Sequence, residues 1–153
     1  MQPNLKQLHQ SAIKYLNEGK VQLAHKSLVE LVSHKPDFAD GYFLLAMVNL
    51  QVGQIYKAIK LIEKALTLGS SIEYTAQLAK CYALTGDLKK AKNVALSVPI
   101  TQIKKALDAD TLGVALTQAG LHEHALHYFE CALTLANAKQ QPQPQFYYNF
   151  AVS

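Results

Sequence analysis

Arginine is absent from this sequence of 153 residues, and all 15 basic residues are lysines. Arginine is the side chain that most often binds phosphate or guanine through two parallel hydrogen bonds. The lysines are spread along segments with a helical pattern, as at Lys57, Lys60 and Lys64, which is typical of a face in contact with water. We therefore expect no nucleic-acid partner, despite a formal net charge of +4.

Long apolar runs, a signal sequence and closely spaced cysteines are also missing. No run approaches the roughly 20 apolar residues that cross a bilayer, and the start, MQPNLKQLHQ, lacks the basic-then-apolar order of a secretory signal. Cys81 and Cys131 match no metal-binding spacing, so we expect small, partly buried thiols; a disulfide or a reactive thiol is the alternative. These features predict a cytoplasmic protein with no membrane contact.

Motifs for catalysis are missing as well, since no glycine-rich phosphate loop or other nucleotide motif occurs. The segment HEHALH supplies His122, His124 and His127, of which at most two share a face of a helix, on its solvated side. We expect no catalytic residue, no cofactor and no metal in this chain.

The feature that organises the sequence is a period of about 34 residues. Four glycines follow one another at intervals of 34, 33 and 34 residues, and an alanine comes five residues after each. The pairs are Gly19 and Ala24, Gly53 and Ala58, Gly86 and Ala91, and Gly120 and Ala125. Such a period indicates a stack of equivalent structural repeats.

Each repeat has the pattern of two helices joined by a glycine turn. In the second repeat, the segment after the glycine carries the apolar stripe of an amphipathic helix, at Ile55, Ala58, Ile59, Ile62, Ala65 and Leu66. The glycine allows the left-handed conformation that ends a helix, and the small alanine allows two helices to approach closely. The period therefore predicts an all-α fold.

These residues resemble the tetratricopeptide repeat (TPR) family. The family pattern of Leu, Gly or Ala, Tyr, Gly, Ala, an aromatic and Ala is matched best in the fourth repeat, by Leu112, Gly113, Gly120, Ala125, Phe129 and Ala132. The resemblance covers residues 5–138. It implies one right-handed superhelical solenoid of antiparallel helix hairpins over residues 1–153, with repeats at about 5–38, 39–71, 72–105 and 106–139 and the start of a further repeat at 143–153.

Proline interrupts the third repeat. Pro99 falls four positions earlier than the family pattern places it, and proline cannot continue the interior of a helix. We expect a short second helix there, followed by a loop or an irregular start to the next helix within SVPITQIKKALDAD.

The resemblance also implies a ligand-binding face, because the first helices of TPR hairpins line a concave groove. The groove candidates are His9, Ile13, Asn17, Phe43, Met47, Leu50, Gln51, Lys80, Asp110, Val114 and Gln118. Of these, Phe43, Met47 and Leu50 form an apolar patch suited to a helix or an extended peptide. The alternative is that this patch is core or is covered by a later repeat.

The last residues, QFYYNFAVS, place Tyr147, Phe150 and Ala151 at the positions that begin a fifth first helix. Since a solenoid ends with a polar cap, we expect an N-terminal piece of a longer protein. The alternative is that these aromatics close the fourth repeat, aided by self-association through this C-terminal helix. The repeats and the linker before it also resemble the N-terminal arrays of bacterial TPR proteins that carry a C-terminal sulfotransferase domain.

Three functions remain open at this point. The first is a scaffold without chemistry that binds a protein or peptide in the concave groove. The second is the regulatory or substrate-presenting arm of a larger enzyme, a sulfotransferase by the resemblance. The third is RNA binding by helical repeats, against which the missing arginines count.

Overall fold

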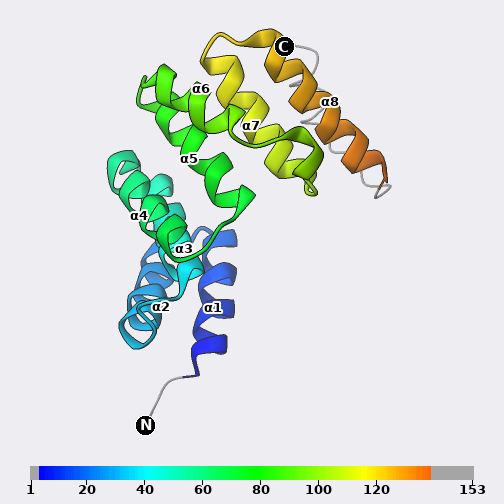
Figure 1. Cartoon of the computed structure of the whole chain (residues 1–153). Coiled ribbons are helices and arrows are strands. Elements are labelled where there is room, and N and C mark those ends of the chain that lie inside the picture. Colours follow the sequence, from blue (N-terminus) through cyan, green and yellow to red (C-terminus); the bar gives the residue numbers. More distant parts are fainter. Residues whose placement is uncertain (1–3, 139–153) are drawn as a thin grey trace. The chain divides into compact units, whose positions relative to one another are not determined.

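The computed structural model describes residues 4–138, so the expectations about residues 140–153 lie outside the described part of the chain. Residues 4–138 contain helices and no strand. They form α1 (Leu5–Asn17), α2 (Val21–His34), α3 (Ala39–Gln51), α4 (Ile55–Leu68), α5 (Ile72–Leu84), α6 (Leu88–Leu96), the 3-10 helix η1 (Ile100–Gln102), α7 (Ala106–Gln118) and α8 (His122–Ala138). The predicted all-α fold is confirmed, with one helix hairpin for each repeat (Figure 1).

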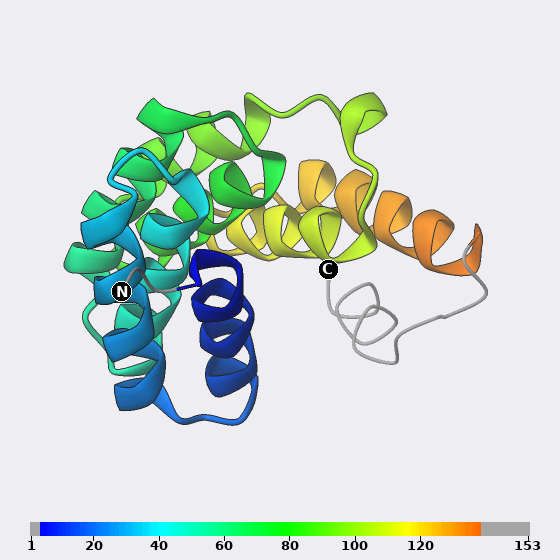
Figure 2. The ribbon, with the colours of Figure 1, turned by 90° about the horizontal axis from the view of Figure 1, so that it is seen from below.

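The helices form two compact units, divided between Ser70 and Ser71. In the N-terminal unit, α1 packs against α2 and α3 packs against α4, and both α1 and α2 also contact α3. In the C-terminal unit, α5 packs against α6 and α7 against α8, and both α5 and α6 contact α7. Figure 2 shows the α7–α8 hairpin in yellow and orange. A single array over residues 1–153 stays a prediction.

The four periodic glycines end the first helix of each hairpin in the same way. Their φ angles lie between 76° and 84°, in the left-handed region. Each glycine is followed by an N–H that donates to a carbonyl five residues back, as Lys20 donates to Tyr15 at 2.8 Å and Leu121 to Leu116 at 2.9 Å. This is the Schellman arrangement of a helix end. No atom lies within 4 Å of where a Cβ would be at any of the four, so backbone conformation and not space selects glycine there.

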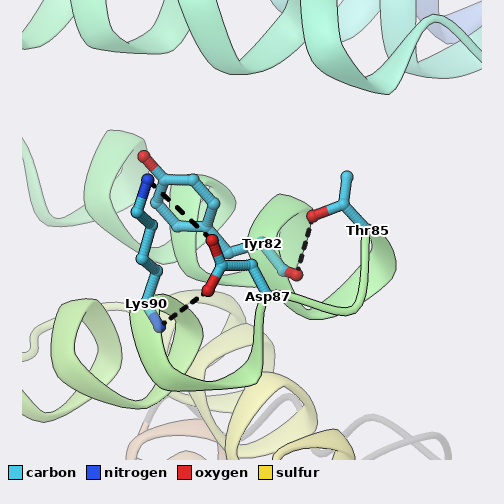
Figure 3. Close-up of polar contacts among 4 residues, drawn as sticks. All are labelled: Tyr82, Thr85, Asp87 and Lys90. Carbon is cyan, nitrogen blue, oxygen red and sulfur yellow. Dashed lines mark hydrogen bonds and ion pairs between the residues drawn. The ribbon is translucent and has the colours of Figure 1, made fainter.

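The turn in the third repeat shows how side chains support this geometry (Figure 3). The Asp87 side chain accepts a hydrogen bond from the backbone N–H of Lys90 at 3.3 Å, which caps the start of α6. The Thr85 hydroxyl donates to the Tyr82 carbonyl at 3.0 Å. The Lys90 Nζ lies 3.8 Å from Asp87 Oδ2 and 5.5 Å from the centre of the Tyr82 ring. These contacts are local and belong to the hairpin turn.

Small side chains fill the helix contacts, as predicted. The four periodic alanines, Ala24, Ala58, Ala91 and Ala125, are fully buried. In the C-terminal unit, Gly113 of α7 lies so close to α8 that a Cβ added there would be 2.6 Å from Phe129 Cε1. The recurring small residue therefore allows the close approach of helices that the sequence pattern predicts.

The third repeat is irregular where Pro99 stands. Helix α6 ends at Leu96, and residues 97–105 form a loop that includes η1, whereas the end of SVPITQIKKALDAD is regular helix because α7 begins at Ala106. Val98 and Ile103 of this loop are buried, and the Tyr128 hydroxyl of α8 donates to the Val98 carbonyl at 2.8 Å. Burial and this hydrogen bond hold the loop against the core of the C-terminal unit.

Candidate peptide-binding faces

In the N-terminal unit, two side-chain contacts join the first helices α1 and α3. His9 Nε2 lies 2.5 Å from Asp40 Oδ2, and Gln51 Nε2 donates to the Leu16 carbonyl at 3.4 Å. The first contact joins the N-terminal halves of the two helices and the second joins their C-terminal ends. Helices α1 and α3 therefore run parallel and side by side, as the resemblance implies for the wall of a groove.

The candidates between these contacts occupy the same helix faces as the contacts themselves. Ile13 follows His9 by four residues on α1, and Met47 precedes Gln51 by four on α3, and residues four apart share a helix face. Ile13 is 39% exposed, and Met47 and Leu50 are partly buried. Asn17 is exposed at the end of α1. This α1–α3 face thus carries accessible apolar side chains with polar groups at both ends.

Two candidates offer little surface to a ligand. Phe43 is 3% exposed, so the third member of the expected apolar patch is core in character. Asp110, on α7, is 7% exposed. Sequence pattern could not separate these from their neighbours, because groove and core positions are adjacent on a first helix that is apolar nearly all round.

In the C-terminal unit, the first helices α5 and α7 also pack together. The candidates Lys80 and Val114 are partly buried there, and Gln118 is exposed. Leu84 and Leu107 are exposed apolar side chains of the same two helices. They lie at the end of α5 and at the start of α7, so the exposed apolar surface of these two helices is at their ends.

A cavity of about 270 Å³ lies beside His9 in the N-terminal unit. Its lining comes from α1, α2 and the connection from α2 to α3, and comprises Leu5, Lys6, His9, Leu31, Lys35 and Phe38. The Phe38 ring meets the His9 ring edge to face, with centroids 5.1 Å apart. The groove pattern predicts His9 but misses Lys35 and Phe38, because these residues lie between helices, where the helical period carries no information.

Burial shifts the pKa of several ionisable side chains elsewhere in the described residues. Burial raises the pKa of the Cys81 thiol to about 11, although nearby Lys80 lowers it, and burial also raises the pKa of Cys131. Both thiols are free. Burial raises the pKa of the Asp108 carboxyl, and Lys105 opposes this shift.

No cluster of three or more His, Cys, Asp or Glu side chains that could hold a metal ion occurs within residues 4–138. His122, His124 and His127 are all exposed at the start of α8. Over the same range, no helix has the length and apolar character needed to cross a membrane.

The repeated hairpins, their glycine turns and the parallel first helices define a helical-repeat fold of the TPR type. Residues 39–68, the α3–α4 hairpin, match the tetratricopeptide repeat family. No curated protein sequence matches the chain. The family match covers the α3–α4 hairpin alone.

Solved structures share this fold along nearly the whole chain. A thermophilic TPR protein of Thermus thermophilus is similar with a TM-score of 0.80 and 19% identity, over 97% of this chain and 80% of that one. PilF of Pseudomonas aeruginosa is similar with a TM-score of 0.79 and 21% identity, over 97% and 66%. MamA of Desulfovibrio magneticus RS-1 has a TM-score of 0.71 and 15% identity, over 99% and 85%. The predicted all-α fold of TPR-like hairpins is confirmed.

Proposed function

We propose that this protein is a scaffold without chemistry that binds a peptide segment of a partner protein along its first helices. The observation that carries the proposal is the α1–α3 face, where Ile13, Met47 and Leu50 offer apolar surface between the His9–Asp40 and Gln51–Leu16 contacts. A face with apolar side chains flanked by polar groups suits an extended or helical peptide. The TPR-type fold supports the same function.

The test is binding of a peptide selected from a random library displayed on phage, with affinity measured by calorimetry on the full chain. Met47→Glu places a charge on the proposed contact surface and is expected to weaken binding by at least about tenfold, which corresponds to about 1.4 kcal/mol. The helical circular dichroism should not change, because Met47 is only partly buried.

The matched control is Val29→Glu, which adds the same charge at an exposed apolar residue of α2. This variant should bind the selected peptide as the wild type does. Unchanged affinity in Met47→Glu, or an equal loss in Val29→Glu, would move the binding site away from the α1–α3 face.

Three finer expectations remain proposals. The chain serves in the cytoplasm, which cell fractionation tests. In the alternative function, the chain is the regulatory or substrate-presenting arm of a larger enzyme. Sequencing the reading frame past the codon for Ser153 tests this alternative. Self-association through residues 143–153 is tested by light scattering across a range of concentrations.

A further inference from the structure

The cavity beside His9 combines an apolar floor with two lysine side chains. Leu5, Leu31 and Phe38 supply the apolar part, and Lys6 and Lys35 supply two ammonium groups. Among the described residues that line the cavity, none is acidic. His9 Nε2 lies 2.5 Å from Asp40 Oδ2, and Asp40 is not among the residues that line the cavity. The lining therefore complements a negative group that lies next to an apolar one.

The two lysines are placed to accept such a group. Lys35 Nζ lies 5.3 Å from the centre of the Phe38 ring, so its charge lies next to the apolar surface that Phe38 presents. Lys6 is exposed one turn of helix or less from both Leu5 and His9 on α1. A carboxylate that enters this cavity gains charge-assisted hydrogen bonds, which are stronger than those between neutral groups.

We infer that this cavity recognises an Asp or Glu side chain next to an aliphatic residue in the bound peptide, which makes the protein a receptor for acidic, apolar segments. The inference rests on the proposed peptide-binding function and names the class of peptide. The aliphatic side chain contacts Leu5 and Phe38, and the carboxylate pairs with Lys6 and Lys35. An excess of lysine over acidic residues in the whole chain favours the same partner charge.

The experiment uses the full chain and a fluorescent peptide of alternating Leu and Glu, acetylated and amidated at its ends so that only side-chain carboxylates are present. Binding is measured by fluorescence anisotropy at physiological ionic strength, where charges farther apart than about 8 Å are screened. Matched peptides replace Glu by Gln, or Leu by Ser. The wild type is expected to bind the Leu–Glu peptide about tenfold more tightly than either, because the Gln peptide lacks the charged hydrogen-bond acceptor and the Ser peptide lacks the apolar side chain.

The variant Lys6→Glu with Lys35→Glu removes the proposed recognition and should lose this preference while it still binds the Gln peptide. The control, Lys57→Glu with Lys60→Glu, makes the same change in net charge on exposed positions of α4 and should keep the preference. Both pairs of lysines are exposed, so the helical content should not change.

Several results would overturn the inference. Equal loss in the α4 control would show that net charge and not the cavity selects the peptide. Binding only by a peptide with a free α-carboxylate would assign the cavity to chain ends. Equal affinity for the Glu and Gln peptides, or no binding of either, would also refute it, whereas the peptides selected by phage display test the scaffold function separately.

Discussion

Gly113→Ala is expected to destabilise the C-terminal unit, although alanine is the better helix former. Helix α7 passes α8 so closely that the new Cβ would lie 2.6, 2.8 and 2.9 Å from three atoms of the Phe129 ring. Phe129 is 2% exposed and has little room to move. Overpacking of a core costs about 1–3 kcal/mol, and the change from Gly to Ala in a helix regains about 1 kcal/mol. The net loss is up to about 2 kcal/mol.

The other repeats explain why this glycine is needed. Gly113 of a first helix and Phe129 of the second helix are 16 residues apart, and the same spacing marks the equivalent positions in the other repeats. The pairs are Ala12 with Leu28, Ala46 with Ile62, Ala79 with Ala95, and Gly113 with Phe129. Alanine thus occurs with the smaller partners and glycine with the aromatic ring. In the fourth repeat, a smaller residue in the first helix compensates for a larger side chain in the second helix, as a closely packed core requires.

A double-mutant cycle tests this reasoning by urea unfolding followed by circular dichroism. The change Phe129→Leu alone leaves a cavity, but with Gly113→Ala it recreates the Ala12–Leu28 combination of the first repeat. The double variant should be more stable than the sum of the single effects by about 1 kcal/mol or more. Additivity within about 0.5 kcal/mol, or a stabilisation of about 1 kcal/mol by Gly113→Ala alone, would refute the close contact.

Two further predictions concern buried ionisable groups. The fold raises the pKa of the Asp108 carboxyl above its ordinary value of 3.8, so the folded state binds the carboxyl proton more tightly than the unfolded state does. The free energy of unfolding therefore falls as the pH rises from the unfolded pKa through the folded pKa. Asp108→Asn should therefore raise the free energy of unfolding at pH 7, and this gain should disappear below about pH 4. Urea unfolding at the two pH values measures the gain, and an equal gain at both would contradict the prediction. With a pKa of about 11 and a buried side chain, Cys81 should not react with a disulfide reagent at pH 8 in the native state, when about one thiol in a thousand is ionised. Two thiols should react after denaturation, and rapid native reaction at Cys81 would show that the thiol is accessible.

The sequence alone was sufficient to predict the elements and their period. Each glycine that marks the 34-residue repeat has a positive φ and ends a first helix. Each periodic alanine is fully buried. The position of Pro99 correctly predicts the short α6. These features are readable because turns, caps and helical stripes depend on residues within a few positions of one another.

The candidate face could be predicted only in part. The positions of His9, Ile13 and Met47 on parallel first helices agree with the resemblance, because helix faces follow from the period. The burial of Phe43 and Asp110 could not be predicted from the period, because both occupy the same repeat position as His9, a candidate that is accessible. Which positions carry a ligand stays a prediction for all the groove candidates.

The sequence by itself therefore determined the repeat, the hairpin turns and the small residues between helices, all of which arise from local backbone and packing preferences. Only the tertiary structure decided how exposed each side chain is and which distant residues meet. It brings Lys35 and Phe38 of a connecting segment next to Lys6 and His9 of α1, and it buries Asp108. Exposure and charge environment depend on neighbours from other helices, which no period within one helix records.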